Sequence, residues 1–105
     1  GLPLTRGRVR GRAWVCSEPG PPPQYQGPLI LVARAIDPGW LPCLTQATGV
    51  AIEIGGDLSH GSILLREMGL PAVTNLRGLW GWVAQGEWLE LNADQGSLSR
   101  CEPPT

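Results

Sequence analysis

The apolar residues of this chain fall into short runs separated by segments rich in glycine and proline. Residues 8–16 alternate between arginine and small or apolar side chains, which is typical of a strand with one solvated face. Residues 29–33 and 50–52 are continuously apolar, as expected of strands that are buried on both faces. These runs predict the central strands of a sheet.

A first helix is predicted between the two continuous apolar runs. Asp37 can cap this helix, and Pro38 can occupy its first position, where a missing N–H costs least. Further apolar residues then recur at helical spacing. The helix should continue through Leu41, Leu44 and Ala47.

A second helix is predicted to start at residue 59 or 60 and to run to about residue 68. Ile63, Leu64 and Met68 form an apolar stripe with the spacing of a helix face packed on a sheet. This helix would therefore cover the central strands.

The remaining chain continues the alternation of short strands and helices. Gly69 can end the second helix in the left-handed conformation. A strand is predicted over 71–74, a short helix within 76–84, and a hairpin from strands 88–92 and 97–99. The pattern predicts an α/β domain in which helices flank a small mixed sheet that ends in a C-terminal β-hairpin.

Length and composition fit one domain over residues 1–105, with the proline-rich segment 19–28 as a loop. Apolar residues make up 42% and charged residues 16% of the chain, which favours a globular protein over a disordered one. The chain begins with Gly1 rather than methionine, so we expect a domain excised from a longer, multidomain polypeptide.

The charge pattern argues against nucleic-acid and membrane partners. The net charge is −1, whereas surfaces that bind nucleic acids or anionic membranes carry clustered positive charge. All eight basic residues are arginine, which excludes a Schiff-base or P-loop lysine.

No signal peptide and no apolar run near the roughly 20 residues of a membrane span is present, so we expect a cytoplasmic location. Four arginines alternate with other residues near the N-terminus: Arg6, Arg8, Arg10 and Arg12. We interpret them as the solvent side of an edge strand rather than as a nucleic-acid-binding arm.

The three cysteines form no CxxC pair and are too few for a zinc site, so no metal is expected. They are interpreted as reduced structural thiols, and the sequence leaves open whether Cys16 and Cys101 pair. A thiol-dependent activity at Cys43 is the weaker alternative, because a buried cysteine is usually structural.

His60 is the only histidine of the chain, and it follows Gly55-Gly56 at the predicted start of a helix. A neutral imidazole can accept a phosphoryl group and pass it on. The glycines would let a bulky phosphate approach the backbone, and the free N–H groups of a helix start favour an anion. From these residues alone, a phosphoryl-accepting histidine and an ordinary histidine at the start of a helix are equally well supported.

The segment around His60 resembles the signature of the swivelling β/β/α phosphohistidine domain of phosphoenolpyruvate-utilising enzymes. The matching residues are Glu53-Ile54-Gly55-Gly56, Ser59-His60-Gly61 and Arg66-Glu67-Met68-Gly69-Leu70-Pro71-Ala72-Val73. This domain occurs in pyruvate phosphate dikinase, phosphoenolpyruvate synthase, enzyme I of the sugar phosphotransferase system and rifampicin phosphotransferase. The chain looks most similar to the synthase and rifampicin phosphotransferase branch.

The resemblance implies a phosphotransferase domain that carries a phosphoryl group between two partner domains and is not a complete enzyme alone. One partner would bind ATP or phosphoenolpyruvate with Mg²⁺, and the other would bind the acceptor substrate; this domain would bind no cofactor itself. His60 would be phosphorylated through Nε2. The supporting residues implied are Gly55, Gly56, Ser59, Gly61 and Arg66.

Two departures from the family pattern motivate a second hypothesis. Asp57 stands where the family usually has an apolar residue, and a carboxylate about 4 Å from a phosphate would cost on the order of 1–4 kcal/mol. Asn75 stands where glycine is common. The alternative is therefore a non-catalytic interaction or regulatory domain that keeps the swivelling fold. Three tryptophans follow Asn75 in the sequence: Trp80, Trp82 and Trp88. We interpret them as part of the core, and an exposed patch for docking a neighbouring domain is the alternative.

Overall fold

Parallel strands form the centre of the sheet in the computed structural model, which describes residues 1–25, 27–36, 38–54 and 59–102. The strands within this part are β1 (Leu2–Pro3), β2 (Arg8–Cys16), β3 (Leu29–Ala33), β4 (Gly49–Ile52), β5 (Ala72–Thr74), β6 (Trp88–Asn92) and β7 (Ser97–Arg100). They form one sheet in the order β1-β5-β4-β3-β2-β6-β7. The strands β2 to β5 run parallel, whereas β1, β6 and β7 are antiparallel to their neighbours.

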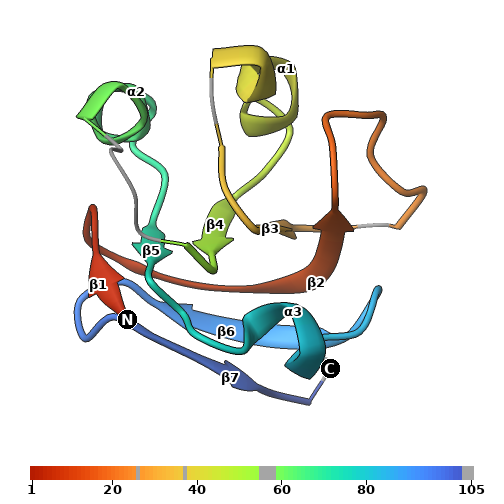
Figure 1. Cartoon of the computed structure of the whole chain (residues 1–105). Coiled ribbons are helices and arrows are strands. Elements are labelled where there is room, and N and C mark those ends of the chain that lie inside the picture. Colours follow the sequence, from red (N-terminus) through yellow and green to blue (C-terminus); the bar gives the residue numbers. More distant parts are fainter. Residues whose placement is uncertain (26, 37, 55–58, 103–105) are drawn as a thin grey trace.

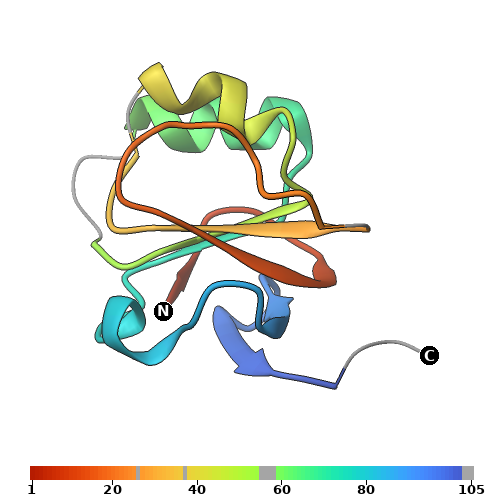
Figure 2. The same cartoon turned by 90° about the vertical axis from the view of Figure 1, so that its right-hand side faces the viewer.

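Helices cover both faces of this sheet. A 3-10 turn, η1 (Pro38–Trp40), leads into α1 (Leu41–Leu44), and α2 (Ser59–Met68) and α3 (Leu79–Trp82) follow later in the chain. The helices α1 and α2 lie on one face, whereas α3 and the β6–β7 hairpin lie on the other (Figures 1 and 2). The predicted α/β class and the C-terminal hairpin are confirmed.

The core is divided between these two faces because successive side chains of a strand point in opposite directions. On the helical face, Leu31 of β3 packs in one cluster with Leu44 of α1 and Leu65 of α2. On the opposite face, Ile30 belongs to a cluster that includes Leu89 of β6. Every residue of β3 is buried, so the prediction of a strand covered on both faces is confirmed.

The sheet curls over without closing, because the two halves of β2 pair with different strands. Residues 8–12 of β2 pair with β6, and residues 12–16 pair with β3. The hairpin therefore returns beneath the sheet, where β6 also contacts β4 and β5 (Figure 2). Gly49 lies at this close approach, since a Cβ there would come 2.6 Å from Val9 Cγ1 and 3.0 Å from Leu91 Cδ2.

The prediction that the arginines of β2 lie on an edge strand was wrong. The strand is internal, because β6 pairs with its arginine-rich half. Arg8 and Arg10 are exposed as expected, and Arg10 forms an ion pair with Glu90 of β6. On this interior strand, the solvent-facing Arg10 is thus paired with the carboxylate of Glu90 on the neighbouring strand.

The first helix is shorter than predicted. It ends at Leu44, and its first residue, Leu41, is 42% exposed. The preceding 3-10 turn orients the helix so that Trp40 and Cys43, rather than Leu41, face the core. Asp37, the predicted cap, lies outside the described residues.

The second helix has the predicted extent, but its buried face differs from the predicted one. Ile63 is 57% exposed, whereas Leu65 is fully buried against the sheet. Positions 63 and 65 are about 200° apart around a helix, so they cannot both face the core. Met68 packs against the core as predicted, and the side chain of Leu64 lies outside the described part. None of the described helices has the length and apolar character needed to cross a membrane.

Candidate functional site

The candidate site lies at the edge of the sheet where the parallel strands end. Helix α2 follows β4 and begins at Ser59, so His60 is its second residue. Gly55, Gly56 and Asp57 lie outside the described residues, as do the side chains at positions 59–62. The structure thus gives the backbone position of His60, in the first turn of α2, the helix labelled in Figure 1.

The start of α2 provides an environment suited to an anion. The first N–H groups of a helix have no partner within the helix, and the helix dipole places partial positive charge there. The ten residues of α2 include no acidic side chain in the first turn. An anion carried at position 60 would therefore meet no like charge from this turn.

The other end of α2 is held by the fold. Leu65 is buried, and the left-handed Gly69 (φ +69°) ends the helix as the sequence predicts. The hydroxyl of Thr5 donates to the carbonyl oxygen of Leu70 at 2.5 Å, which ties the end of α2 to the segment between β1 and β2. The helix is thus anchored at its C-terminal half, while His60 lies in its first turn.

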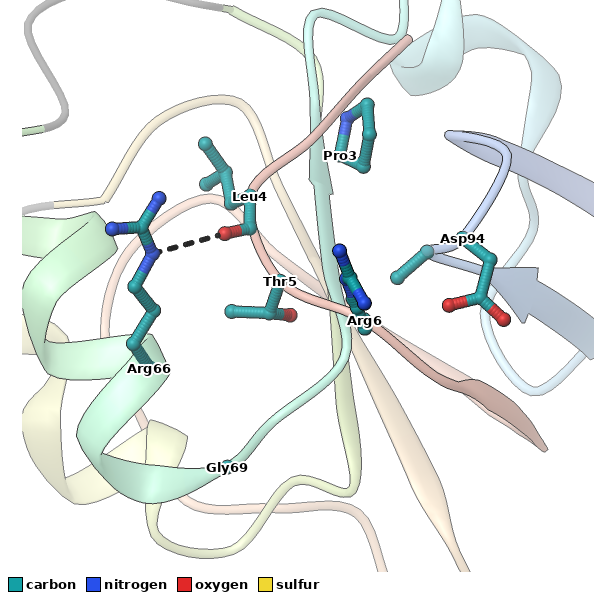
Figure 3. A pocket seen from close by; sticks show the side chains of 8 residues that line it. Pro3, Leu4, Thr5, Arg6, Arg66, Gly69 and Asp94 are labelled. Carbon is teal, nitrogen blue, oxygen red and sulfur yellow. Dashed lines mark hydrogen bonds between the residues drawn. The ribbon is translucent and has the colours of Figure 1, made fainter.

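Arg66 lies in the last turn of α2, six residues after His60. Its Nε donates to the carbonyl oxygen of Leu4 at 3.4 Å, and its side chain lines an open groove of about 900 Å³ (Figure 3). The groove is lined by Pro3, Leu4, Thr5, Arg6, Arg66, Gly69, Ala93 and Asp94. The described contacts of Arg66 therefore join α2 to the N-terminal segment.

The strand ends beside the histidine loop are joined by a set of hydrogen bonds. The hydroxyl of Thr74 donates to Ile54 O at 3.3 Å, and the N–H of Leu76 donates to Ile52 O at 3.1 Å. Asn75 lies between these bonds with φ +60°, a left-handed conformation that asparagine tolerates better than most residues. Glycine would adopt this conformation even more readily, which explains why asparagine can occupy a position where glycine is common.

Glu53 is a structural residue of this edge that the sequence analysis did not single out for a role. Its Oε2 accepts the N–H of Trp80 in α3 at 2.7 Å, and its Oε1 lies 3.4 Å from Nε of Arg34. The carboxylate therefore connects the ends of β3 and β4 with the start of α3. The only sequence signal was an acidic residue directly after a buried apolar run.

A hollow of about 470 Å³ opens beside these strand ends. Arg77 is exposed in its wall and has no hydrogen-bond or ion-pair partner among the described residues. The lining residues are Glu53, Ile54, Asn75, Arg77 and Gly78. The hollow combines the exposed guanidinium of Arg77 with the exposed side chain of Ile54, next to the chain segment that leads to His60.

The three thiols are free, so Cys16 and Cys101 form no disulfide. Burial, together with the neighbouring Cys43 thiol, raises the pKa of Cys16 to about 11. The Sγ of Cys43 is buried and donates to Gly20 O at 3.4 Å. Such thiols are poor nucleophiles, which favours the structural interpretation. Across the described ranges, no three His, Cys, Asp or Glu side chains gather as metal ligands.

The tryptophans divide between core and surface. Trp14 and Trp40 are buried, and Trp80 and Trp88 are half-buried. Trp82 is 36% exposed and stacks with Arg100, whose Cζ lies 4.3 Å from the ring centre. Core packing thus does not account for Trp82.

Comparison with known proteins identifies the family. The family model for the mobile domain of PEP-utilising enzymes matches residues 25–96, which include the His60 segment and the strands around it. The chain belongs to this family. The resemblance inferred from the motif is therefore confirmed.

Several curated relatives support this assignment. The chain is 34% identical over 98 residues to rifampicin phosphotransferase of Bacillus cereus, covering 93% of this chain and 11% of the relative. It is 35% identical over 99 residues to the prodigiosin synthesizing transferase PigC of Serratia marcescens, again covering 93% and 11%. The chain thus spans about a tenth of the length of these relatives.

Solved structures show the same fold. An NMR structure of Enzyme I aligns with a TM-score of 0.62 at 23% identity, over 73% of this chain and 32% of that chain. An NMR structure of a UPF0107 protein aligns with a TM-score of 0.70 at 17% identity, over 96% of both chains. At these identities the likeness concerns the fold alone.

Proposed function

We propose that this chain is a phosphoryl-carrier domain in which His60 is transiently phosphorylated. The observation that carries the proposal is the position of the only histidine, in the first turn of α2, in a chain of the PEP-utilising mobile-domain family. Gly55, Gly56, Ser59 and Gly61 would shape the phosphate-binding loop. Arg66 would support it from within α2, through the contacts that hold the helix to the N-terminal segment.

The transfer uses the neutral imidazole as nucleophile. The lone pair of Nε2 attacks the phosphorus atom of the donor, an N–P bond forms, and the P–O bond to the leaving group breaks. The departing oxygen keeps the electron pair of that bond, and the ring keeps its proton on Nδ1. The second transfer reverses these roles, with an acceptor oxygen attacking phosphorus and His60 leaving as neutral imidazole once the acceptor proton is lost. The helix start favours the phosphorylated state through its free N–H groups.

The partners proposed are domains of a longer protein that works in the cytoplasm. A nucleotide-binding domain would hold ATP, or phosphoenolpyruvate, with Mg²⁺, and a substrate-binding domain would hold the acceptor. The support is that the chain spans 11% of relatives that include a rifampicin phosphotransferase. The carrier itself needs only a nucleophile and an exposed helix start, since catalysis of phosphoryl transfer rests on positioning and charge neutralisation.

The test is the intact mass of the full-length protein after incubation with Mg²⁺ and either ATP or phosphoenolpyruvate. We expect a gain of one phosphoryl group that mild acid removes, and we expect His60→Ala to abolish it. Gln46→Ala is the control, because it changes an exposed polar residue outside the proposed site and keeps the nucleophile. A folded, ATP-binding wild-type protein without this phosphate would support the alternative of a non-catalytic interaction or regulatory domain.

A further inference from the structure

The open groove of about 900 Å³ at the C-terminal end of α2 is lined by two arginines, Arg6 and Arg66. Arg6 is exposed and forms no hydrogen bond or ion pair with any described residue. Arg66 uses Nε to bind the carbonyl oxygen of Leu4, and its two Nη atoms have no partner in the described part of the chain. The groove thus presents guanidinium N–H groups that the contacts of the fold do not use.

This groove lies at the opposite edge of the sheet from position 60. Arg6 comes just before β2 begins and Gly69 comes just before β5, whereas position 60 follows the end of β4. These three strands run in the same direction, so their beginnings share one edge of the sheet and their ends share the other. Positions 60 and 66 are also about 9 Å apart along the axis of α2. A ligand in the groove would therefore bind apart from the proposed phosphoryl site.

A carboxylate lines the same groove. Oδ1 of Asp94 accepts the backbone N–H of Gly7 at 3.0 Å, and its Oδ2 has no partner among the described residues. Figure 3 shows Asp94 and Arg66 on opposite sides of the segment that carries Leu4 and Arg6. The groove therefore offers two cationic donors together with one free acceptor, and it fits a ligand that has both anionic groups and N–H donors.

The size and openness of the groove favour an elongated ligand. Its volume of about 900 Å³ is far larger than an inorganic phosphate or a single carboxylate needs. Small-molecule sites bury most of their ligand, whereas this groove is open and is lined by four consecutive residues, 3–6. An extended peptide suits such a surface, because it can direct alternate side chains into the groove and supply backbone N–H donors as well.

We propose that this groove binds an extended acidic peptide segment. Carboxylates of the segment bind the guanidinium groups of Arg6 and Arg66, and a backbone N–H of the segment binds Asp94. Guanidinium and carboxylate groups match in shape and form charge-assisted, bidentate hydrogen bonds. This inference rests on the longer polypeptide proposed above, and it does not depend on phosphorylation of His60.

The weakness of exposed ion pairs indicates where the segment comes from. Each such pair improves affinity by no more than about fivefold, so two pairs alone bind weakly. They are effective when both partners belong to one chain, because linkage raises the effective concentration to roughly the millimolar range. The chain covers only 11% of the length of its relatives. We therefore expect the acidic segment in the same polypeptide, outside residues 1–105.

The first test measures how fast phenylglyoxal modifies individual arginines of the full-length protein, followed by mass spectrometry. At low ionic strength Arg6 should react about threefold to fivefold more slowly than Arg8, which is also exposed and unpaired among the described residues but lies outside the groove. At about 1 M salt the two rates should converge, because the Debye length falls to about 3 Å and the segment is released. Equal rates at low ionic strength, or a difference that salt does not change, would overturn the proposal.

The second test identifies the occupant with a photo-crosslinking residue at position 95, which is exposed and next to Asp94. We expect capture of a peptide outside residues 1–105 that is rich in aspartate and glutamate, and about threefold to fivefold less capture in Arg6→Gln. Arg10→Gln is the matched control, since Arg10 does not line the groove and its loss should leave capture unchanged. Capture of only a second copy of this chain, of a peptide without acidic residues, or of no peptide would contradict the proposal.

His60→Ala separates this inference from the carrier function. The variant removes the proposed nucleophile but keeps all three charged residues of the groove, so it should show the wild-type protection of Arg6 and the wild-type crosslink. Loss of both in His60→Ala would refute a separate peptide site. Protection of Arg6 only by added inorganic phosphate, without a crosslink, would show a small-anion site and would refute it as well.

Discussion

The carboxylate of Glu53 provides the sharpest test of how the fold supports the site. It is directly followed by Ile54 and the two glycines, so its position sets where the histidine loop begins. Its side chain is 15% exposed and binds the N–H of Trp80 at 2.7 Å and the guanidinium of Arg34 at 3.4 Å. Three variants separate these contacts: Glu53→Ala, Glu53→Gln and Arg34→Gln.

The two contacts of Glu53 should contribute unequally. Removal of the carboxylate leaves the Trp80 N–H without its partner in a partly buried place, which costs about 1–3 kcal/mol. The Arg34 side chain is 59% exposed, so the ion pair should contribute no more than about 0.5 kcal/mol after screening by solvent. We therefore expect a loss of about 2–3 kcal/mol for Glu53→Ala and about 1 kcal/mol for Glu53→Gln, which keeps an acceptor oxygen.

Urea unfolding followed by tryptophan fluorescence measures these differences, since Trp80 itself lies beside the contact. Arg34→Gln serves as the control that removes the ion pair and keeps the hydrogen bond. An unfolding free energy of Glu53→Ala within about 0.5 kcal/mol of wild type would refute the reasoning. So would an equal loss in Arg34→Gln, because the ion pair would then dominate.

Three further predictions follow from the backbone and the thiols. Because Asn75 has φ +60°, Asn75→Ala should lower the free energy of unfolding in urea by about 1–2 kcal/mol, whereas Asn75→Gly should leave it almost unchanged. Equal effects of the two substitutions would contradict this account. Gly86→Ala should lower the free energy of unfolding more than Gly69→Ala in the same assay. Both positions have positive φ, but only a Cβ at position 86 would contact the hydroxyl of Tyr25, at 2.7 Å. Equal losses would show that this contact has no effect. The raised pKa of Cys16 stabilises the fold fully below about pH 9, and this stabilisation is lost as pH rises toward 11. Between pH 9 and pH 11 the unfolding free energy should therefore fall by about 2 kcal/mol more in wild type than in Cys16→Ala, and parallel pH profiles would show that Cys16 is not responsible.

The central strands and α2 could be predicted because their signals are local. The run 29–33 is apolar throughout, and only a strand covered on both faces can bury it. The extent of α2 followed from its glycine stop, and the histidine motif placed His60 at its start. The phase of α2 could not be predicted, since adjacent apolar residues at 63, 64 and 65 fit more than one buried face.

Contacts between distant segments account for the other differences. The pairing of β2 with both β3 and β6 depends on a hairpin about 80 residues later, so the arginine alternation alone could not distinguish an edge strand from an internal one. The role of Glu53 rests on an N–H that lies 27 residues away along the chain. Spacing along a sequence carries no information about such a partner, although an acidic residue at the end of a buried run is a reason to look for one.

The two ends of α2 are built for different tasks. Leu65 and the hydrogen bond from Thr5 to Leu70 fix the C-terminal half of the helix to the sheet and the N-terminal segment. One turn after the start of the helix, Ile63 is exposed, and position 63 shares a helix face with position 60. A carrier needs both properties, because the helix must hold its nucleophile in a constant geometry while the surface around that nucleophile binds and releases a partner. Because the Ile63 side chain is 57% exposed, Ile63→Ser should change the unfolding free energy in urea by less than about 0.5 kcal/mol, whereas truncation of the buried Leu65 to Ala should cost about 2–5 kcal/mol.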